Sequence, residues 1–390
     1  MTEYGRRDFL AMSALGVLGA AGVFRSGKAS ADEQLLYVGT YTENNRTDGI
    51  YLVHMNSRTG DLRLESAMNA GANPSFLAIH PNGHTLYVVN ETAEHNGKPG
   101  GGVSAFAIAS ETGALTRLND QSSGGAGPCY VSVDRRGRVV LVANYDGGSV
   151  AVLPIDTSGG LGAATHVEQH QGKGPNVERQ EAPHAHCIVS DPSSRFALAV
   201  DLGIDRVRVY RLDDERGVLH HVDGADAVLR AGAGPRHIVF HPTLPLVFVA
   251  NELNSTVSTL QLDRERGDLK VIDSSSTLPK GWTGENFPAD IHIDPLGSVV
   301  YVSNRGHNTI AVFSVAKRTG ALALRQVIPT EGDWPRNFAL DPTGRWLLVA
   351  NQRSGSVVVL ARDPKSGLLT STKQQLQIPN PACVRFRARE

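Results

Sequence analysis

Short apolar runs separated by polar turns recur along most of the chain. Each unit begins with Pro or Ala before a short apolar run, passes a turn of the type His/Asp-Pro-x-Gly, continues with a second apolar run ending in Asn, and closes at Gly-x-Leu. The six units are Asn73–Leu115, Gly127–Leu161, Ala182–Leu219, Gly234–Leu269, Phe287–Leu322 and Trp334–Leu369. A repeat of this size predicts stacked units that share one continuous core.

The apolar runs have the composition of strands. They are short, rich in β-branched and aliphatic residues, and bounded by Gly, Pro, Asn and Asp, whereas no helical period extends over a useful length after residue 31. The polar residue that ends the second run lies at Asn90, Asn144, Asp201, Asn251, Asn304 and Asn351, at intervals of 54, 57, 50, 53 and 47 residues. These intervals are typical of propeller blades, and we expect the Asn amides to satisfy loop backbone groups.

The two ends of the chain supply a seventh unit. Leu35–Val38 and Gly49–His54, followed by Gly60-Asp61-Leu62, resemble the later strands of a unit that lacks its first strand, and Pro381–Phe386 resembles a first strand alone. Joined, they close the ring and pair both open sheet edges. We therefore predict an all-β fold, a seven-bladed β-propeller of four-stranded antiparallel blades, over residues 32–390.

The first 31 residues have the pattern of a twin-arginine export signal. Gly5-Arg6-Arg7-Asp8-Phe9-Leu10 precedes the apolar stretch Ala11–Phe24, and Ala29-Ser30-Ala31 offers a small-residue cleavage site. We expect a periplasmic or secreted protein with no membrane span after cleavage of residues 1–31.

Composition narrows the choice of partners. Lys and Arg number 38 and Asp and Glu 39, for a net charge of −1, and no basic stripe is present, which argues against nucleic-acid binding. Cys129, Cys187 and Cys383 lie in first strands of three units, where we expect buried packing residues rather than a disulfide framework. We expect a monomer that binds a small molecule.

Candidate site residues come from positions where the units differ. Five residues before the turn residue stand Ser75, Cys129, His186, Arg236, Ala289 and Arg336, and the next position holds Phe76, Tyr130, Cys187, His237, Asp290 and Asn337. A further set directly follows the Asn or Asp of the second run: Glu91, Tyr145, Leu202, Glu252, Arg305 and Gln352. First strands begin and second strands end on the same face of a propeller, so these sets converge on one mouth of the central channel.

The third unit differs most, with a long leading loop, Gly162–Pro183, and the run Pro183-His184-Ala185-His186. Alternation along a strand places both histidines on one side. The pair is incomplete as a metal site, because no third ligand lies nearby, whereas an imidazole at a channel mouth suits a general base. Each histidine could also be held by loop backbone for structure alone.

The remaining histidines are assigned structural or surface positions. His80 and His241 occupy the turn position and are expected to cap the turn, and His166, His170, His220 and His221 are expected to be exposed. Glu91 and the loop Thr92–Gly102 either form part of the mouth or lie on the rim, and we favour the rim because Gly and Lys without an apolar anchor suggest mobility.

Several motifs together resemble one family. They are Gly172-Lys173-Gly174-Pro175-Asn176, Arg179-Gln180-Glu181-Ala182-Pro183-His184-Ala185-His186, Gly234-Pro235-Arg236-His237, Phe240-His241-Pro242, Asn251-Glu252-Leu253 and Tyr301-Val302-Ser303-Asn304-Arg305-Gly306. The chain after residue 31 is similar throughout to the seven-bladed propeller lactonases, which include propeller-type 6-phosphogluconolactonases and the fungal carboxy-cis,cis-muconate lactonizing enzyme.

The resemblance implies an active site of His184 or His186, Arg236, Glu252 and Arg305, with His186 favoured because it shares the register of Arg236. For lactone hydrolysis we expect His186 or Glu252 to act as base, Arg236 to stabilise the oxyanion, and Arg305 with Arg179 or Lys173 to hold a carboxylate or phosphate. Further candidate substrate-binding residues are Asn144, Tyr145, Asp201, Asp290, Arg336, Asn337 and Gln352. No cofactor and no metal are expected.

The same residues also suit other functions. Export favours an unphosphorylated aldonolactone or another cyclic ester, although 6-phosphogluconolactonase is the nearest named activity. A lactonizing cycloisomerase would use the same His, Glu and Arg, and a non-catalytic exported propeller would bind a protein or glycan. A metal-dependent six-bladed gluconolactonase is disfavoured by the seven units and by the lack of a clustered calcium-ligand set.

Overall fold

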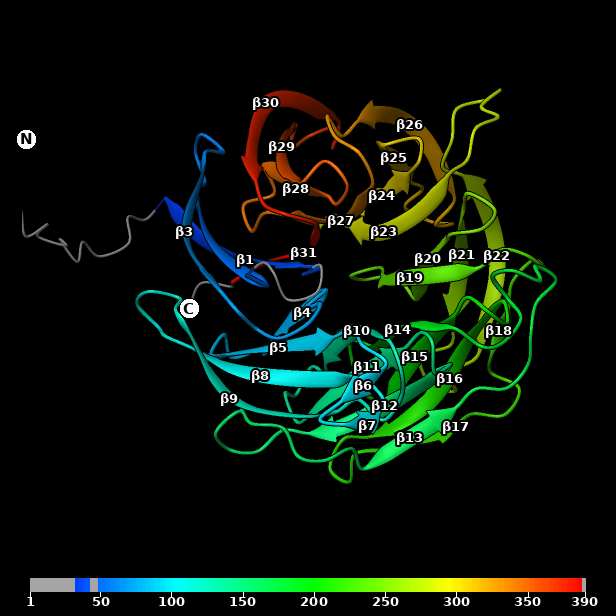
Figure 1. Cartoon of the computed structure of the whole chain (residues 1–390). Coiled ribbons are helices and arrows are strands. Elements are labelled where there is room, and N and C mark those ends of the chain that lie inside the picture. Colours follow the sequence, from blue (N-terminus) through cyan, green and yellow to red (C-terminus); the bar gives the residue numbers. More distant parts are fainter. Residues whose placement is uncertain (1–31, 43–47, 388–390) are drawn as a thin grey trace, which may run out of the picture.

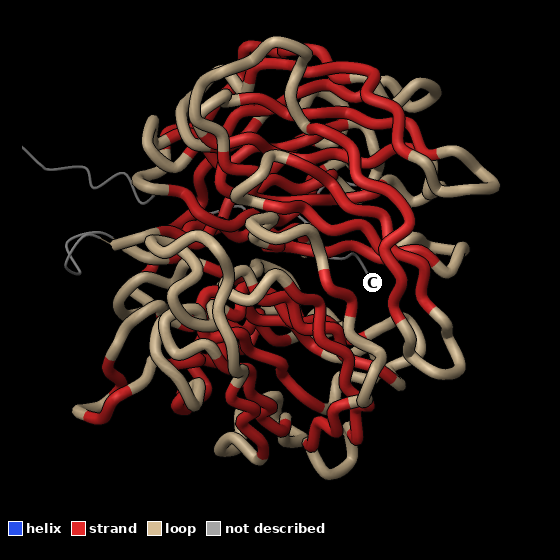
Figure 2. The backbone as a smooth tube through the Cα atoms, turned by 90° about the vertical axis from the view of Figure 1, so that its right-hand side faces the viewer, coloured by secondary structure: helices blue, strands red, loops and turns tan. Residues whose placement is uncertain are grey.

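Strands alone make up the regular structure of the part of the chain that the computed structural model describes, residues 32–42 and 48–387. Seven four-stranded antiparallel sheets surround a central axis as blades (Figure 1). Figure 2 shows the ring from the side, where strands fill the body and loops emerge on its surface. This confirms the predicted all-β, seven-bladed propeller.

Each blade is given from its innermost to its outermost strand. Blade one consists of β4 (Phe76–Ile79), β5 (Thr85–Asn90), β8 (Gly102–Ile108) and β9 (Leu115–Ser122). Blade two consists of β10 (Pro128–Val133), β11 (Val139–Asn144), β12 (Ser149–Pro154) and β13 (His166–Gln169). Blade three consists of β14 (Ala185–Ser190), β15 (Phe196–Asp201), β16 (Arg206–Asp213) and β17 (Val218–His221), and β18 (Ala227–Val228) also pairs with β16. Blade four consists of β19 (Pro235–Phe240), β20 (Leu246–Asn251), β21 (Thr256–Leu262) and β22 (Leu269–Ser276). Blade five consists of β23 (Phe287–Ile293), β24 (Val299–Arg305), β25 (Thr309–Val315) and β26 (Leu322–Pro329). Blade six consists of β27 (Pro335–Leu340), β28 (Trp346–Asn351), β29 (Ser356–Arg362) and β30 (Leu369–Gln377).

Blade seven joins the two ends of the chain, as predicted. It consists of β31 (Pro381–Phe386), β1 (Glu33–Thr40), β2 (Ile50–Asn56) and β3 (Leu62–Met68), and β31 runs antiparallel to β1. The innermost strands contact one another around the axis, and β31 contacts both β27 and β4. The ring is therefore closed by strand pairing.

Buried aromatic side chains tie neighbouring blades together. The second strand of a blade is buried along its length, as in Thr85–Asn90. The buried hydroxyl groups of Tyr37, Tyr87 and Tyr301 donate to the carbonyl oxygens of Gly113, Gly159 and Gly367, each in a turn of the following blade, at 2.7, 2.9 and 2.7 Å. Each ring thus adds apolar contact area and its hydroxyl finds a partner, which stabilises the stacking of the blades.

The turn and strand-end residues perform the structural roles expected of them. His80 and His241 accept backbone N–H groups of their own turns through Nδ1, and their Nε2 atoms bond the carbonyls of Gly137 and Gly297 in the next blade. The Asn144 amide donates to the Ser123 carbonyl at 3.0 Å. The three cysteines are free and buried, which confirms their assignment to packing.

Two segments differ from the expected loops. Four residues of the leading loop Gly162–Pro183 form β13, the outermost strand of blade two, and the loop Thr92–Gly102 contains the hairpin β6 (Glu94–His95) and β7 (Lys98–Pro99). The expected export signal, residues 1–31, lies outside the described residues. In the described ranges, no helix is long and apolar enough to cross a membrane.

A bulge near the start of the innermost strands positions the candidate site. In β10, β14, β19, β23 and β27 the pairing register shifts at this point, for example between Pro235 and His237. A bulge sets two residues against one on the partner strand, so consecutive side chains can face the same way. Arg236 and His237 therefore both reach partners in the channel, Glu252 and Asp290 respectively.

Candidate active site

Three arginines surround one buried glutamate at the end of the channel where the innermost strands begin. Glu252 directly follows β20, and its Oε1 accepts from Arg179 Nη2 at 2.7 Å, while its Oε2 accepts from Arg305 Nη2 at 2.5 Å and lies 3.1 Å from Arg236 Nε. Glu252, Arg236 and Arg305 are 3, 2 and 5% exposed. We call this end of the channel, with its arginine cluster, the site mouth.

The charge states of the cluster follow from burial and from its own ion pairs. Burial alone would raise the pKa of Glu252, but the charges of Arg305, Arg236 and Arg179 outweigh it and lower that pKa to about 2. Burial lowers the pKa of Arg305 to about 9 and also lowers that of Arg236. At neutral pH the glutamate is ionised and Arg305 remains a cation.

A second polar group lies beside this cluster. Arg336 Nη2 donates to the Tyr41 hydroxyl at 2.6 Å, and Tyr41 and Ser75 donate to Glu91 Oε2 at 2.7 and 2.5 Å. Glu91 was expected on the rim, and the structure corrects this, because the residue is half-buried and its carboxylate accepts hydrogen bonds from blade seven and blade one. Together, the cluster around Glu252 and the cluster around Glu91 contain four guanidinium groups and two carboxylates. This excess of positive charge favours an anionic ligand.

His184 is held in a defined orientation. Its ring stacks on Tyr145, with centroids 4.5 Å apart, and Tyr145 in turn accepts from Arg179 at 3.2 Å. Its Nδ1 lies 3.1 Å from the Tyr145 carbonyl oxygen and its Nε2 lies 3.1 Å from Oε1 of the exposed Glu181. Because the carbonyl and the carboxylate can both only accept, each ring nitrogen faces an acceptor to which it can donate a proton.

His186 has a more enclosed environment. Its Nδ1 lies 3.6 Å from Cys129 Sγ, and its ring meets those of Tyr145 and His237 edge-on. Burial, together with the charge of Arg236, lowers the pKa of His186 well below its usual value. The ring is therefore neutral near pH 7 and a weak base.

A buried network supports the backbone at His184. Asp201 Oδ1 accepts the backbone N–H groups of His184 and Gly203 at 2.8 and 2.9 Å, and its Oδ2 lies 2.6 Å from His170 Nδ1. The Tyr210 hydroxyl lies 3.0 Å from His170 Nε2. His170 was expected to be exposed, but it is 1% exposed and belongs to this network.

Gly203 fits closely beneath the same loop. A Cβ atom at this position would lie 1.9 Å from the Ala182 carbonyl oxygen and 2.7 Å from the His184 nitrogen. Only a residue without a side chain allows this approach.

A layer of side chains lies one step deeper in the channel. Arg236 Nη1 donates to His237 Nε2 at 3.1 Å, and His237 Nδ1 donates to Asp290 Oδ1 at 2.8 Å. Tyr130 contacts Phe76 and His237 with ring centroids 4.2 and 5.0 Å apart, and Asn337 Nδ2 donates to Asp290 Oδ2. We call Phe76, Tyr130, His237, Asp290 and Asn337 the closing layer.

The closing layer carries one defined negative charge. Burial and the charge of Arg236 lower the pKa of His237 to about 3. Burial opposes ionisation of Asp290, but its histidine partners and hydrogen bonds outweigh it and hold that pKa well below its usual value. His237 is therefore neutral and Asp290 ionised at neutral pH.

The other predicted site residues lie apart from the arginine cluster. Lys173 is exposed, Asn144 is buried at a strand end, Asp201 supports the His184 backbone, and Asp290 and Asn337 belong to the closing layer. Gln352 is half-buried. Within residues 32–42 and 48–387, no group of three or more His, Cys, Asp or Glu is arranged to hold a metal ion.

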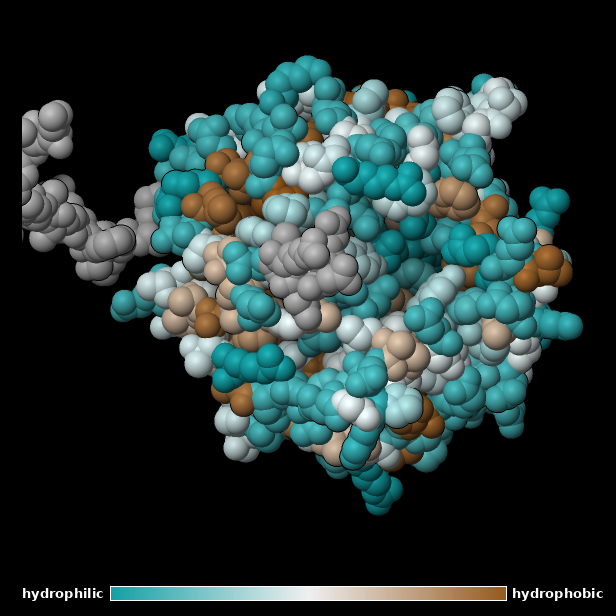
Figure 3. Space-filling view, viewed as in Figure 1, coloured by the Kyte–Doolittle hydropathy of each residue, from teal (hydrophilic) through white to brown (hydrophobic). Residues whose placement is uncertain are grey.

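The face of the molecule shown in Figure 3 is mainly hydrophilic, with hydrophobic residues scattered over it.

Comparisons with known proteins agree with the fold. Residues 35–386 match the family model described as "Lactonase, 7-bladed beta-propeller". A 6-phosphogluconolactonase of Bacillus subtilis is 39% identical over 350 residues, which are 90% of this chain and 97% of that protein. A 6-phosphogluconolactonase of Formosa agariphila is 33% identical over 88% of this chain and 96% of its own length.

A solved structure is similar over nearly the same span. The periplasmic gluconolactonase of Pseudomonas aeruginosa superposes with a TM-score of 0.85 at 33% identity, covering 91% of this chain and 99% of that one.

Proposed function

The chain belongs to the lactonase family of seven-bladed β-propellers, and from this we propose that it hydrolyses a sugar-acid lactone at the site mouth. The observation that carries the proposal is the excess of guanidinium charge beside an oriented imidazole. Four arginines meet two carboxylates there, and the His184 ring is held between the Tyr145 carbonyl oxygen and the Glu181 carboxylate. This combination suits a cyclic ester that carries, or on opening gains, an anionic group.

We assign the base to His184. Its Nε2 takes a proton from water as the water oxygen attacks the lactone carbonyl carbon, and the imidazolium is stabilised by Glu181 at 3.1 Å. The C–O bond of the ring then breaks, and the proton passes from the imidazolium to the leaving alkoxide, giving the open hydroxy acid. His186, which only the repeat register favours, is a weak base because its pKa is lowered.

The arginines stabilise charge in this scheme. Arg236 is nearly fully buried, and no hydrogen bond from its Nη2 is formed within the described residues. A fixed donor of this kind suits the oxyanion of the tetrahedral intermediate and is worth on the order of 3 kcal/mol. We assign Arg305, Arg179 and Arg336 to bind a carboxylate or phosphate of the substrate.

Glu252 holds the arginines in place rather than accepting a proton. Its pKa of about 2 makes it a poor base near neutral pH, and both of its oxygens are engaged by guanidinium groups.

We propose that hydrolysis takes place in the periplasm. The sequence of residues 1–31 has the pattern of a twin-arginine signal, and the similar Pseudomonas aeruginosa protein is named as periplasmic. There the substrate is an aldonolactone such as glucono-δ-lactone. The guanidinium excess predicts that its 6-phosphate is also accepted.

A panel of lactones tests the function. The chain from Asp32 onward is assayed with glucono-δ-lactone, its 6-phosphate and a muconolactone, with and without a chelator, beside His184→Ala, His186→Ala and the exposed control His220→Ala. We expect hydrolysis of the first two lactones, unaffected by chelator and by His220→Ala, and lowered about a thousandfold by His184→Ala.

Three outcomes would contradict parts of the proposal. Absence of turnover with every lactone would favour a binding protein, and isomerisation of the muconolactone without hydrolysis would favour a cycloisomerase. Full activity of His184→Ala with loss in His186→Ala would transfer the base to His186.

A further inference from the structure

A cavity lies at the end of the channel opposite the site mouth. It is open to solvent and has a volume of about 600 Å³, and its lining includes Ser132, Ser190, Phe240 and His292, from the later halves of four innermost strands. These strands begin at the site mouth, so the cavity opens on the face that carries the turns. We call it the far cavity. The closing layer separates it from the arginine cluster, and Tyr130 and Asp290 of that layer form part of its wall.

Arg385 gives the far cavity a cation with spare hydrogen-bonding capacity. Its Nε donates to the Leu77 carbonyl oxygen at 3.1 Å and its Nη1 to the Val384 carbonyl oxygen at 2.8 Å, and its guanidinium lies 4.6 Å from the centre of the Phe76 ring. Within the described residues, Nη2 makes no hydrogen bond and no carboxylate lies within ion-pair distance of Arg385. The guanidinium is thus fixed in position while one side remains available.

The carboxylate that shares the cavity is already engaged. Asp290 Oδ1 accepts from His237, and Oδ2 accepts from Asn337 and lies 3.0 Å from His292 Nε2. It therefore has little capacity left to neutralise Arg385 by contact. The His292 side chain is 31% exposed, and Arg135 adds a second, exposed guanidinium to the lining.

We propose that the far cavity is a second ligand site, which binds a small anion through its carboxylate or phosphate group at Arg385. The volume accommodates a molecule of the size of a sugar acid, and the guanidinium fork matches either anion. Because the closing layer lies between them, ligands at the far cavity and at the site mouth do not compete for space. The proposal does not depend on lactone hydrolysis.

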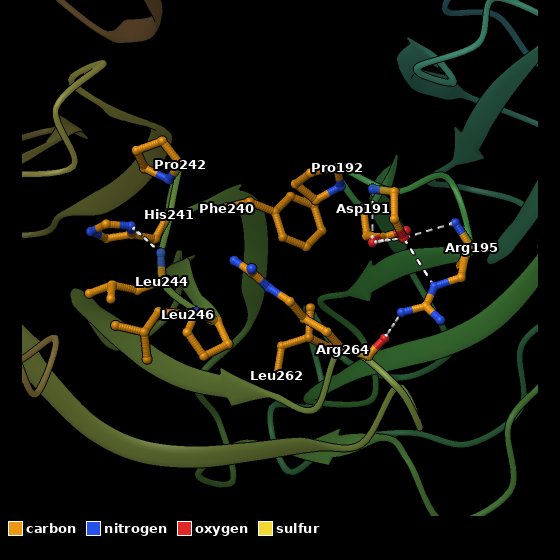
Figure 4. A pocket seen from close by; sticks show the side chains of 12 residues that line it. Asp191, Pro192, Arg195, Phe240, His241, Pro242, Leu244, Leu246, Leu262 and Arg264 are labelled. Atoms are coloured by element: carbon orange, nitrogen blue, oxygen red, sulfur yellow. Dashed lines mark hydrogen bonds between the residues drawn. The ribbon is translucent and has the colours of Figure 1, made fainter.

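A neighbouring pocket on the same face provides a control. This pocket, of about 220 Å³, shares Phe240 with the far cavity and is shown in Figure 4. Its arginines have partners, since Arg264 donates to the Thr243 carbonyl oxygen at 2.9 Å and Arg195 pairs with Glu265 at 3.2 Å. A change at Arg264 therefore removes a cation from this face without touching the far cavity.

The test follows the His292 imidazole by ¹⁵N-resolved NMR during titration with inorganic phosphate and, separately, with gluconate. We expect a saturable shift of the His292 signals in the wild-type protein and in Arg264→Gln. Binding at this site should weaken about tenfold or more in Arg385→Gln and less in Arg135→Gln, because a charge-assisted contact is lost. Which of the two probes saturates at lower concentration identifies the anion class.

Two results would overturn the proposal. One is the absence of any His292 shift at millimolar concentrations of either probe. The other is an undiminished shift in folded Arg385→Gln, because the His292 signal would then report an anion bound at the site mouth. If Arg385→Gln does not fold, the anion affinity of Arg135→Gln is compared with that of Arg264→Gln. Equal affinities of those two variants would count against binding at the far cavity.

Discussion

Glu252 compensates three guanidinium groups, two of which are almost fully buried. We predict that Glu252→Gln lowers the free energy of unfolding by about 3 kcal/mol or more, because Arg236 and Arg305 are left as buried charges without a counter-ion. Thermal or denaturant unfolding measures this loss. Lactone turnover should fall as well, because the arginines lose their fixed positions.

The same carboxylate predicts a dependence of stability on pH. Its pKa is about 2 in the folded protein and about 4.5 unperturbed, so its contribution is complete above pH 4.5 and is lost as the pH falls toward 2. The difference in stability between wild type and Glu252→Gln should shrink over this range. Glu265→Gln, which breaks an exposed pair with Arg195, is the control and should leave the stability nearly unchanged. Equal acid profiles of wild type and Glu252→Gln would contradict this account.

Asp201 predicts a separate effect on catalysis. Asp201→Ala removes the acceptor of two backbone N–H groups and of His170, which should loosen the loop that carries His184 and lower kcat about tenfold or more. Asp201→Asn keeps one acceptor oxygen and should retain more of the activity. Steady-state kinetics, with kcat and KM determined separately, provide the measurement.

Asn351→Ala is the matched control for Asp201, because it occupies the same position in blade six and its amide bonds the Thr330 carbonyl. It should lose stability and keep kcat. An equal loss of kcat in both alanine variants would show that Asp201 has only a structural role.

The sequence predicts single residues well where they follow the repeat and poorly elsewhere. Arg236, Glu252 and Arg305 were identified from repeat positions, and they lie together as expected. Simple alternation could not show that neighbours such as Arg236 and His237 both face the channel, because this depends on a bulge. His170 lies in a segment without periodicity, and the available signal was Asp201, which breaks the Asn pattern and cannot donate as an amide does.

At the scale of strands, the pairing of β31 with β1 closes the ring, and removing it should open two sheet edges. We predict that a chain ending at Asn380 is insoluble or unfolds at a temperature lower by about ten degrees or more, because β1 loses its partner and the core loses Val384 and Cys383. Solubility and thermal unfolding measure this. A chain ending at Arg387, which keeps β31 whole, is the control and should behave as the full chain; equal stability of both would contradict the role of β31.

The strands themselves were predictable because each blade repeats the same apolar pattern. The exceptions were β13 and the hairpin of β6 and β7, which have mainly polar, exposed sequences. β13 forms because the edge of β12 is available for pairing. The hairpin forms because Asn96 and Gly97 in its turn adopt positive φ. Neither cause is visible in hydrophobic periodicity.

At the scale of the whole molecule, charge is unevenly distributed. The chain has a net charge of −1, yet four guanidinium groups face two carboxylates at the site mouth. We predict that kcat/KM for the 6-phosphate of glucono-δ-lactone falls several-fold when ionic strength rises from low to physiological salt, because screening weakens attraction of the anion. Neutral glucono-δ-lactone is the control and should show little change. Parallel salt responses of the two substrates would contradict a role for this charge excess.

The order in which the ring is assembled has a consequence for biosynthesis. β31 follows all the other strands of the ring in the sequence, and it pairs with β1, which precedes them. Blade seven therefore cannot form on a nascent chain, whereas blades one to six are each complete within a continuous stretch. A translocon that threads unfolded chains could receive this protein before the ring closes, while one that accepts folded cargo would have to wait until β31 has been made. The twin-arginine pattern of residues 1–31 predicts the second order of events.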